Sequence, residues 1–304
     1  MSKIIASNIL KKKYLSFLSS QEVQSEPFYN KLGQLKDFYS PICEKIYQDY
    51  IKTKKIRIIG LTGGQGAGKS TITKIIKLIL NYKYNLKVTY FSIDDFYKTL
   101  EERTKLSKSI HKLFKMRGVP GTHDTKLLKK TFSDLTKKNF KPVLIPTFDK
   151  SIDDRTTKKK WKKVHLQPHI IIFEGWCVGA KSQKIKDLIK PINILEKKED
   201  QQLTWRNKVN KELKNDYKKV FNKIDRLIFL KVPNFECVYK WRLLQEKKLQ
   251  LTSKGKKIMS AIQVRNFIMY YERLTMQMLK DLTYNAYAVL YLDKKHRFNK
   301  IKFN

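Results

Sequence analysis

Cysteine is rare in this sequence of 304 residues, which contains only Cys43, Cys177 and Cys237. They lie far apart and form no CxxC pair, so the sequence predicts neither a disulfide framework nor a cysteine-based zinc site, and a reducing compartment fits. Long apolar runs are also lacking, since no stretch approaches the ~18 residues typical of a membrane-spanning helix. We therefore expect a cytoplasmic protein with no membrane partner.

Acidic residues and arginine are scarce relative to lysine. The chain has 66 Lys and Arg against 27 Asp and Glu, a formal net charge of +39, and only 10 of the basic residues are arginine. Proteins that read nucleic acid depend on arginine, whose planar guanidinium forms paired hydrogen bonds. The abundance of Lys, Ile and Asn instead suggests coding from an AT-rich genome. We expect no specific nucleic-acid partner, and a polyanion-binding surface is the alternative.

Glycine and proline number only 11 and 8, and 41% of the residues are hydrophobic, which favours a folded core with long elements. Short β-branched runs alternate with helical patterns, so we predict an α/β fold with a mostly parallel sheet covered by helices on both faces. Residues 1–52 are expected to be an N-terminal helical extension, broken near Pro27 and Pro41, and residues 53–304 the main domain. The expected strands are 55–62, 85–93, 142–148, 169–175, 226–232 and 286–293, and the expected helices include 69–81, one that begins at Asp124, and 259–282.

Four of the glycines lie in GGQGAGKS, residues 63–70, which matches G-x-x-x-x-G-K-[ST] between an expected strand and an expected helix. Small residues let backbone N–H groups converge on phosphate oxygens, and the start of the helix adds its dipole. Lys69 is expected to reach the β- and γ-phosphates of ATP, and Ser70 to ligate Mg²⁺. The predicted nucleotide-binding residues are Gly63, Gly64, Gln65, Gly66, Ala67, Gly68, Lys69, Ser70 and Thr71.

Acidic side chains end two expected strands, in SIDDFY (92–97) and HIIIFEGW (169–176). The carboxyl ends of parallel strands meet at one edge of the sheet, beside the phosphate-binding loop. One of Asp94 and Asp95 is expected to accept the proton of an attacking hydroxyl or to help hold the metal, with a helix N-cap as the alternative role. Glu174 is expected to organise Mg²⁺ through water or to polarise the nucleophile, because an unused charge at the end of a buried strand is costly.

A second cluster of glycine and proline, RGVPGTHD at residues 117–124, predicts a loop. It carries Arg117, His123 and Asp124 within eight positions, a set that suits a small polar ligand. A surface position is the alternative for His123, and Asp124 is also suited to cap the helix that follows.

Several segments together resemble the P-loop D-glycerate 3-kinase family of plants, fungi and cyanobacteria, which is related to uridine kinases, phosphoribulokinases and pantothenate kinases. The resemblance is carried by SIDDFY, RGVPGTHD, PTFDKSIDDR and EGWCVG, and continues through WRNKVN, FNKIDRLIFLKVP, YKWRLLQEKKL and YYERLT. One departure lies in the segment after FDKS, where only Ile152 and Asp153 precede DR. Many relatives carry a longer, glycine-containing loop at this place.

The resemblance implies a P-loop kinase fold for 53–304 and ATP-dependent phosphorylation of the 3-hydroxyl of D-glycerate, with Mg²⁺ held by Ser70, Asp94 and Glu174. It implies Lys69, Asp94 and Glu174 as catalytic residues, with Asp94 as the base and Asp95 facing away or supporting the loop. In the acceptor site, cationic side chains would bind the carboxylate and Thr122 and His123 would bind hydroxyls. The expected acceptor-binding residues are Arg117, Thr122, His123, Asp124, Lys150 and Arg155. Arg206 and Arg242 each follow a Trp and are expected in a lid or the adenine pocket. The alternative is that these Trp residues are core anchors.

Other functions are compatible with parts of this pattern. The nearest alternative is a kinase of uridine, pantothenate or a sugar phosphate. A nucleic-acid-stimulated NTPase is less favoured, because the glutamine sensor and arginine-finger motifs of such enzymes are not found. A protein that binds ATP without turnover is also less favoured, because Lys69, Ser70, Asp94 and Glu174 are all present. The oligomeric state is not indicated.

Overall fold

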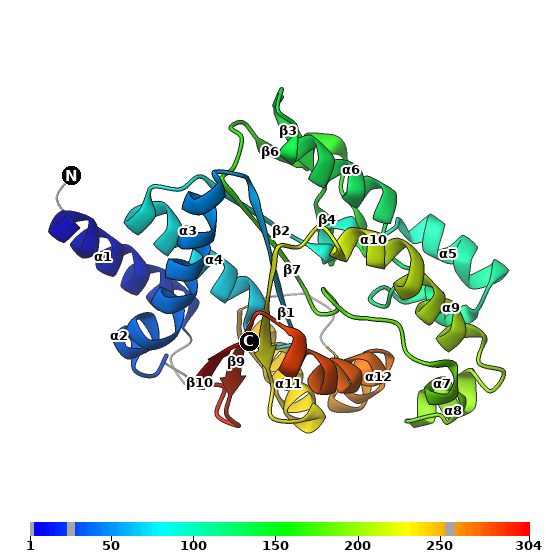
Figure 1. Ribbon diagram of the computed structural model, residues 1–304. Coiled ribbons are helices and arrows are strands. Elements are labelled where there is room, and N and C mark those ends of the chain that lie inside the picture. The colour runs from blue at the N-terminus through cyan, green and yellow to red at the C-terminus, as the bar shows by residue number, and fades with distance from the viewer. Residues whose placement is uncertain (1–2, 23–27, 253–258) are drawn as a thin grey trace.

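The computed structural model describes residues 3–22, 28–252 and 259–304, and its centre is a six-stranded sheet with helices on both faces (Figure 1). The helices are α1 (Lys3–Gln21), α2 (Lys31–Gln34), α3 (Ser40–Thr53), α4 (Lys69–Tyr84), α5 (Leu100–Ser109), α6 (Thr125–Thr136), α7 (Ile185–Ile189), α8 (Ile194–Glu199), α9 (Thr204–Glu212), α10 (Lys218–Phe221), α11 (Phe235–Thr252) and α12 (Ala261–Asn285). The strands are β1 (Arg57–Gly63), β2 (Val88–Ser92), β3 (Val143–Ile145), β4 (Phe148–Asp149), β5 (Asp154–Arg155), β6 (Lys162–Val164), β7 (Ile170–Gly175), β8 (Arg226–Lys231), β9 (Ala288–Leu292) and β10 (Phe298–Phe303). Short 3-10 turns cover Ile93–Phe96, Lys112–Lys115 and Lys158–Lys160, and π-helical turns cover Leu35–Tyr39 and Leu213–Tyr217.

The main sheet has the strand order β10-β9-β8-β1-β7-β2, and all of its strands are parallel except β10. This confirms the predicted mostly parallel sheet and five of the six expected strands. In the register, Glu174 of β7 lies beside Leu61 of β1 on one side and Ser92 of β2 on the other. The carboxyl ends of these three strands therefore meet at one edge, where the predicted phosphate loop begins and where the acidic residues of both segments lie.

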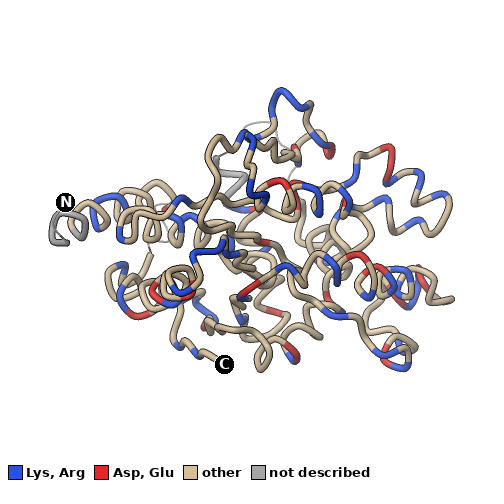
Figure 2. The backbone as a smooth tube through the Cα atoms, turned by 45° about the horizontal axis from the view of Figure 1, so that its top comes forward, with Lys and Arg blue, Asp and Glu red and all other residues tan. Residues whose placement is uncertain are grey.

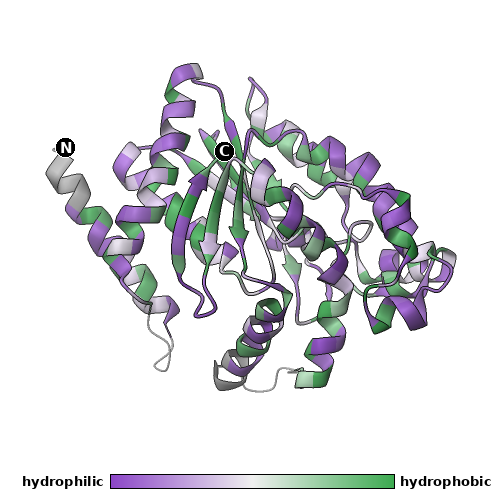
Figure 3. Cartoon of the chain, turned by 60° about the horizontal axis from the view of Figure 1, so that its bottom comes forward, coloured by the Kyte–Doolittle hydropathy of each residue, from purple (hydrophilic) through white to green (hydrophobic). Residues whose placement is uncertain are grey.

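Each face of the sheet has its own hydrophobic cluster, because successive strand residues point to opposite sides. Ile170 and Ile172 pack with residues of α1, α3 and α4, whereas Ile171 and Phe173 pack with residues of α6, α10 and α12. Figure 3 shows hydrophobic residues concentrated in the central strands. Leu10, Tyr14 and Leu18 of α1 belong to the first cluster, so the N-terminal helices share the core of the main domain. The boundary between 52 and 53 stays a prediction.

Three expectations about local structure were wrong. Segment 142–148 does not enter the main sheet: β3 pairs with β6 in a separate two-stranded sheet, and β4 pairs with β5 in another. The helix does not break at Pro41, because proline fits the first turn of α3, which continues directly from the preceding π-helical turn. The other expected break, at Pro27, lies outside the described residues. Strand β10 was not expected, since its lysines gave it no apolar run.

No helix in the part of the chain that the structure describes is long and apolar enough to cross a membrane. Lys and Arg are spread over helices and loops throughout the chain rather than gathered in one element (Figure 2).

Candidate active site

The phosphate-binding loop joins β1, which ends at Gly63, to α4, which begins at Lys69. At Gly66 the backbone has φ +79° and a Cβ would lie 2.8 Å from Cβ of Trp241, so both conformation and space require glycine. Lys69 Nζ donates to the carbonyls of Gly63 and Gly64, each at 3.0 Å. Burial lowers the pKa of Lys69, and the carboxylate of Glu174 opposes this shift. The structure thus gives the sequence motif its expected strand–loop–helix setting.

Glu174 lies directly beside the phosphate loop. Ser70 Oγ donates to Glu174 Oε1 at 2.9 Å, and Glu174 is 7% exposed. Burial raises the pKa of Glu174, although Lys69 opposes this shift. Hydroxyl and carboxylate oxygens are the hard ligands that Mg²⁺ prefers, so this pair fits the expected metal. The described residues contain no cluster of three or more His, Cys, Asp or Glu able to hold a metal.

The two adjacent aspartates have different roles because β2 ends at Ser92 and a 3-10 turn begins there. Asp95 accepts from the backbone N of Ser92 at 3.0 Å and completes a capping box with the Ser92 hydroxyl. Asp94 instead accepts from the Tyr97 hydroxyl at 2.9 Å and from Lys150 Nζ at 2.7 Å. Asp95 is therefore a structural residue of the turn, and Asp94 is the carboxylate that lies among charged partners.

Burial is the largest single influence on the pKa of Asp94 and would raise it, but the charge and hydrogen bond of Lys150, together with smaller contributions from its other neighbours, lower the pKa to about 2. The charges of Asp94 and Lys150 also act on the pKa of both Lys69 and Glu174. These four side chains, which come from four separate segments of the sequence, therefore lie within electrostatic reach of one another at one site.

The loop 117–124 lies against the segment that follows Asp94. Lys98 N donates to the carbonyl of Thr122 at 2.9 Å, and Asp124 N donates to the carbonyl of Phe96 at 2.7 Å. The Tyr271 hydroxyl donates to the carbonyl of Arg117 at 3.2 Å, and Trp176 Nε1 donates to the carbonyl of Gly118 at 2.9 Å. Backbone groups of the loop thus find their partners in distant parts of the chain, which fixes its shape.

Gly118 is required in this loop. Its φ is +138°, and a Cβ there would lie 2.2 Å from the hydroxyl oxygen of Tyr271. A side chain at this position would force Tyr271 away from the Arg117 carbonyl that it binds.

The structure gives the polar side chains at the end of the loop unequal roles. The Thr122 hydroxyl is fully buried, donates to the Val119 carbonyl at 2.7 Å and accepts from Gly118 N at 3.1 Å, so it closes the turn instead of facing a ligand. Asp124 caps α6, because its Oδ1 accepts from Leu127 N at 2.9 Å.

His123 is not on the surface, as one reading of the sequence had it, but is 1% exposed. Its Nδ1 lies 2.6 Å from the Tyr217 hydroxyl, and its ring stacks on Tyr97. The Tyr217 hydroxyl accepts from Gly121 N, and among the described residues its proton has no acceptor other than Nδ1, so we assign the imidazole proton to Nε2. Burial lowers the pKa of His123 to about 3, so the ring is neutral. Nε2 has no hydrogen-bond partner among the described residues.

All three cations expected at the acceptor are paired with groups of the protein. Lys150 contacts Asp94, and Arg117 forms an ion pair with Asp153. Arg155 donates to the Tyr97 carbonyl at 2.8 Å and lies 3.5 Å from Asp124. Two of them, Lys150 and Arg155, stand at the two ends of the short 150–155 segment.

Several important residues were not predicted from the sequence. Arg103 of α5 is fully buried and donates to the carbonyls of Lys98, Lys115 and Asp153, at 3.2, 2.9 and 2.6 Å. It thereby joins the segment after Asp94 to the 150–155 segment. Arg103 belongs to no sequence motif, and an arginine in a polar helix gives no sign that it will be buried. Asp153 lies within PTFDKSIDDR, but the sequence assigned it no role.

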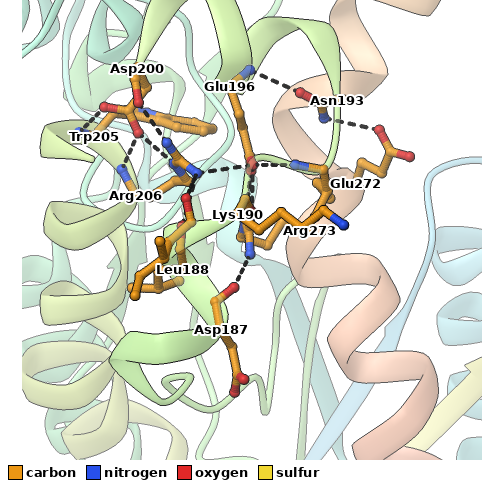
Figure 4. Close-up of polar contacts among 12 residues, drawn as sticks. Asp187, Leu188, Lys190, Asn193, Glu196, Asp200, Trp205, Arg206, Glu272 and Arg273 are labelled. Atoms are coloured by element: carbon orange, nitrogen blue, oxygen red, sulfur yellow. Dashed lines mark hydrogen bonds and ion pairs between the residues drawn. The ribbon is translucent and has the colours of Figure 1, made fainter. Parts of the chain in front are cut away.

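Arg206 was expected near the nucleotide, but it belongs to a buried ionic cluster at α7, α8 and α9 (Figure 4). It donates to Asp200 Oδ2 at 2.9 Å and lies 3.6 Å from Glu196, which also binds Arg273 of α12. Its neighbour Trp205 is 3% exposed, so the core-anchor alternative was correct here.

Arg242 forms an ion pair with Glu246, one turn along α11, and lies over the ring of Phe267. A contact of Arg242 with the nucleotide stays a prediction.

Two cavities lie next to the loop 117–124 and not at the phosphate loop. The larger, of about 580 Å³, lies between α5, the start of α6 and α9, and includes His123 and Asp124 in its lining. The smaller, of about 30 Å³, separates Val119, Pro120 and Trp176 from the ionic cluster of Figure 4. Neither cavity is lined by Lys69, Asp94 or Glu174, so we locate the chemistry from the side chains instead.

Comparison with known proteins gives consistent matches. The Phosphoribulokinase / Uridine kinase family matches residues 58–236. The chain is 35% identical over 222 residues to the uncharacterized kinase mug58 of Schizosaccharomyces pombe, covering 70% of this chain and 78% of that protein. It is 31% identical over 223 residues to the chloroplastic D-glycerate 3-kinase of Arabidopsis thaliana, covering 70% of this chain and 46% of that protein.

A solved structure of D-glycerate 3-kinase from Cryptococcus neoformans has a TM-score of 0.73 to this chain at 22% sequence identity, covering 88% of this chain and 99% of that one. This likeness establishes the fold.

Proposed function

The chain belongs to the Phosphoribulokinase / Uridine kinase family and is therefore a P-loop kinase, and from this premise we propose that it transfers the γ-phosphoryl group of ATP to the 3-hydroxyl of D-glycerate. The similarity to the Arabidopsis D-glycerate 3-kinase supports this acceptor. The observation that carries the proposal is the group of side chains at the end of β2: a candidate base, Asp94, with Lys150 in contact and Arg117 beside Lys150.

The proposed reaction is an in-line displacement. The 3-hydroxyl oxygen of the acceptor bonds to the γ-phosphorus, the bond from that phosphorus to the β–γ bridging oxygen breaks, and the hydroxyl proton passes to Asp94. The products are ADP and 3-phosphoglycerate. Lys69 is proposed to neutralise charge on the phosphates, and the amides of 63–71 to bind them. Mg²⁺, when bound at Ser70, Glu174 and Asp94, would neutralise further phosphate charge.

The resting charge of Lys150 makes Asp94 a weak base, since its pKa is about 2. An acceptor carboxylate near Lys150 and Arg117 would attract both cations and weaken the ion pair between Lys150 and Asp94. The pKa of Asp94 would then rise, because burial is the largest influence on this group and it acts upward. Binding of an anionic acceptor would thus produce a stronger base at the moment of proton transfer.

Hydroxyl recognition is proposed to use His123 Nε2, a buried neutral donor with no partner in the described structure. Arg155 is proposed to position the acceptor indirectly, since it donates to the carbonyl of Tyr97. Asp124 is proposed to act together with Arg155, also indirectly, because its carboxylate caps α6. The Thr122 hydroxyl is not proposed as a ligand, because both its donor and its acceptor capacity are used within the loop.

The test is ADP release by the purified protein with ATP and D-glycerate, uridine, pantothenate or ribulose 5-phosphate as acceptor. We expect turnover with D-glycerate and little with the others. Asp94→Asn should lower kcat by about 10²- to 10⁴-fold, the usual contribution of a general base, with ATP affinity nearly unchanged. Turnover of uridine but not D-glycerate would refute the acceptor, and near-normal kcat in Asp94→Asn would refute the base.

A cytoplasmic location is proposed from the sequence.

A further inference from the structure

Two ion pairs lie side by side at the proposed acceptor site. Lys150 contacts Asp94 at 2.7 Å, and Arg117 contacts Asp153. The positive charge of Arg117 tends to lower the pKa of Lys150, so the two cations are close to each other. The cations proposed to bind an acceptor carboxylate are therefore each engaged by a carboxylate of the protein itself.

The backbone of Asp153 is fixed, whereas its side chain is accessible. The residue has φ +54°, in the left-handed region, and its carbonyl accepts from Arg103 Nη2 at 2.6 Å. Arg103 also donates to the carbonyls of Lys98 and Lys115, so its position does not depend on the Asp153 carboxylate alone. The Asp153 side chain is 37% exposed and that of Arg117 is 24% exposed, so a small solute can reach the pair.

Arg117 is held in place independently of Asp153. Its backbone carbonyl is bound by Tyr271, and its guanidinium lies 5.6 Å from the centre of the Phe148 ring. The guanidinium thus keeps its place when its carboxylate partner changes, and it can bind any planar carboxylate in two parallel hydrogen bonds.

We propose that the Asp153 carboxylate occupies, on Arg117, the place of the acceptor carboxylate, and that an acceptor must displace it in order to bind. This inference rests on the proposed function, because it assumes an acceptor of the hydroxy-acid class. A carboxylate-bearing acceptor replaces one anion by another, so Arg117 stays neutralised and the displaced Asp153 keeps Arg103 and water as partners. A neutral polyol offers Arg117 no anion. Asp153 therefore determines how tightly an anionic acceptor binds, because it competes with the acceptor carboxylate for Arg117, whereas a neutral polyol leaves this ion pair intact.

The test compares acceptor binding by the full-length wild-type protein and Asp153→Asn, measured by calorimetry with a non-hydrolysable ATP analogue present. Asparagine tolerates the left-handed backbone and keeps an oxygen for Arg103. Removing the competing charge should lower Kd for D-glycerate about fivefold, in the range of a partly exposed ion pair. Glycerol, which lacks the carboxylate, should bind no better to the variant than to the wild type.

Two controls separate competition at Arg117 from a general change of charge. Asp149→Asn removes a charge from the same segment, where Asp149 binds Ser151, and should leave Kd for D-glycerate within twofold of the wild type. In an Arg117→Met background, Asp153→Asn should have no further effect on Kd. Asp153→Gly, which fits φ +54° without strain, repeats the test if the Asn variant is unstable.

The outcomes distinguish this inference from the proposed function. If Asp153→Asn and Asp153→Gly fold normally but bind D-glycerate no more tightly, or if Asp149→Asn has the same effect, the inference is wrong even where the wild type phosphorylates D-glycerate. If both variants bind D-glycerate more tightly through Arg117 but the wild type does not phosphorylate it, the inference stands and the proposed function is wrong. If none of the proteins binds D-glycerate, both are wrong.

Discussion

The ion pair between Lys150 and Asp94 makes a specific prediction for Lys150→Met. In the wild-type protein the pKa of Asp94 is about 2, below its ordinary 3.8, because Lys150 and smaller contributions from other neighbours together exceed the effect of burial. Without the ammonium, burial is opposed only by those smaller contributions, so the pKa of Asp94 should rise. An aspartate acting as a base must be deprotonated, so the acid limb of activity should move to higher pH.

The same change affects stability with a definite sign. A carboxyl with a depressed pKa adds stability above its unfolded pKa, and this contribution is lost as the pH falls through the folded pKa. For Asp94 the relevant window runs from 3.8 down to about 2. A pKa lowered from 3.8 to about 2 corresponds to roughly 2.5 kcal/mol. Lys150 is 60% exposed, however, so water screens much of the attraction, and we expect Lys150→Met to lower the free energy of unfolding at pH 7 by about 1 to 2 kcal/mol.

The assay is kcat/KM for the acceptor between pH 4 and 9, which reports ionisations of the unliganded enzyme, together with urea unfolding at pH 7. Lys150 also lowers the pKa of Glu174, so Lys150→Met should raise the pKa of both carboxyls, and the readout is the difference between the two pH profiles. Lys163→Met, a change at an exposed lysine of β6, is the matched control and should leave the profile unchanged. If the acid limb of Lys150→Met coincides with that of the wild type, the assigned cause of the low Asp94 pKa is wrong.

Two other predictions concern Gly118 of the loop 117–124 and Arg206 of the buried ionic cluster. Gly118→Ala should destabilise the fold by about 2 kcal/mol or more, because the alanine is strained at φ +138° and its Cβ overlaps with Tyr271. The same variant should lower kcat/KM for the acceptor at least tenfold. Unchanged acceptor kinetics would contradict this role for the loop. Arg206→Met should lower the free energy of unfolding by about 3 to 5 kcal/mol, because Asp200, 1% exposed, loses its buried partner. Urea titration measures the free energy of unfolding of both variants. Lys112→Met, which removes an exposed ion pair, is the control and should lower the free energy of unfolding by less than about 1 kcal/mol.

The phosphate-binding half of the site could be predicted from sequence because its parts are local. A strand, a glycine turn and a helix follow one another within residues 57–84, so the motif carries its own structural context. Glu174 could be predicted for a similar reason, since it ends an apolar strand and parallel strands end at one edge. The assignment of Asp94 rather than Asp95 rested on resemblance, and the capping of Ser92 by Asp95 now supplies a physical reason for it.

The acceptor half could not be predicted in detail because its geometry depends on long-range contacts. Whether the Thr122 hydroxyl faces a ligand is decided by the turn that Gly118 permits, and nothing in the local pattern gives this. The partners of Arg117 and Arg103 meet at Asp153, which is 36 residues from Arg117 in sequence. Arg206 follows a tryptophan in a helix, and only the packing of α7 and α8 against α9 makes it a buried ion.

The phosphate-binding half of the site is built locally, whereas the acceptor half depends on long-range contacts, and this difference affects acceptor specificity. A Gly- and Pro-rich loop has no regular hydrogen bonding of its own, so its backbone groups need partners elsewhere. Here Trp176, directly after β7, and Tyr271, on α12, supply them for Gly118 and Arg117. Under the proposed function, the position of the Arg117 guanidinium, and with it the choice between an anionic and a neutral acceptor, is set by residues that are not themselves proposed to touch the nucleotide or the acceptor. We therefore expect substitutions at such supporting positions to change acceptor preference while leaving the proposed phosphate contacts of Lys69 unaffected.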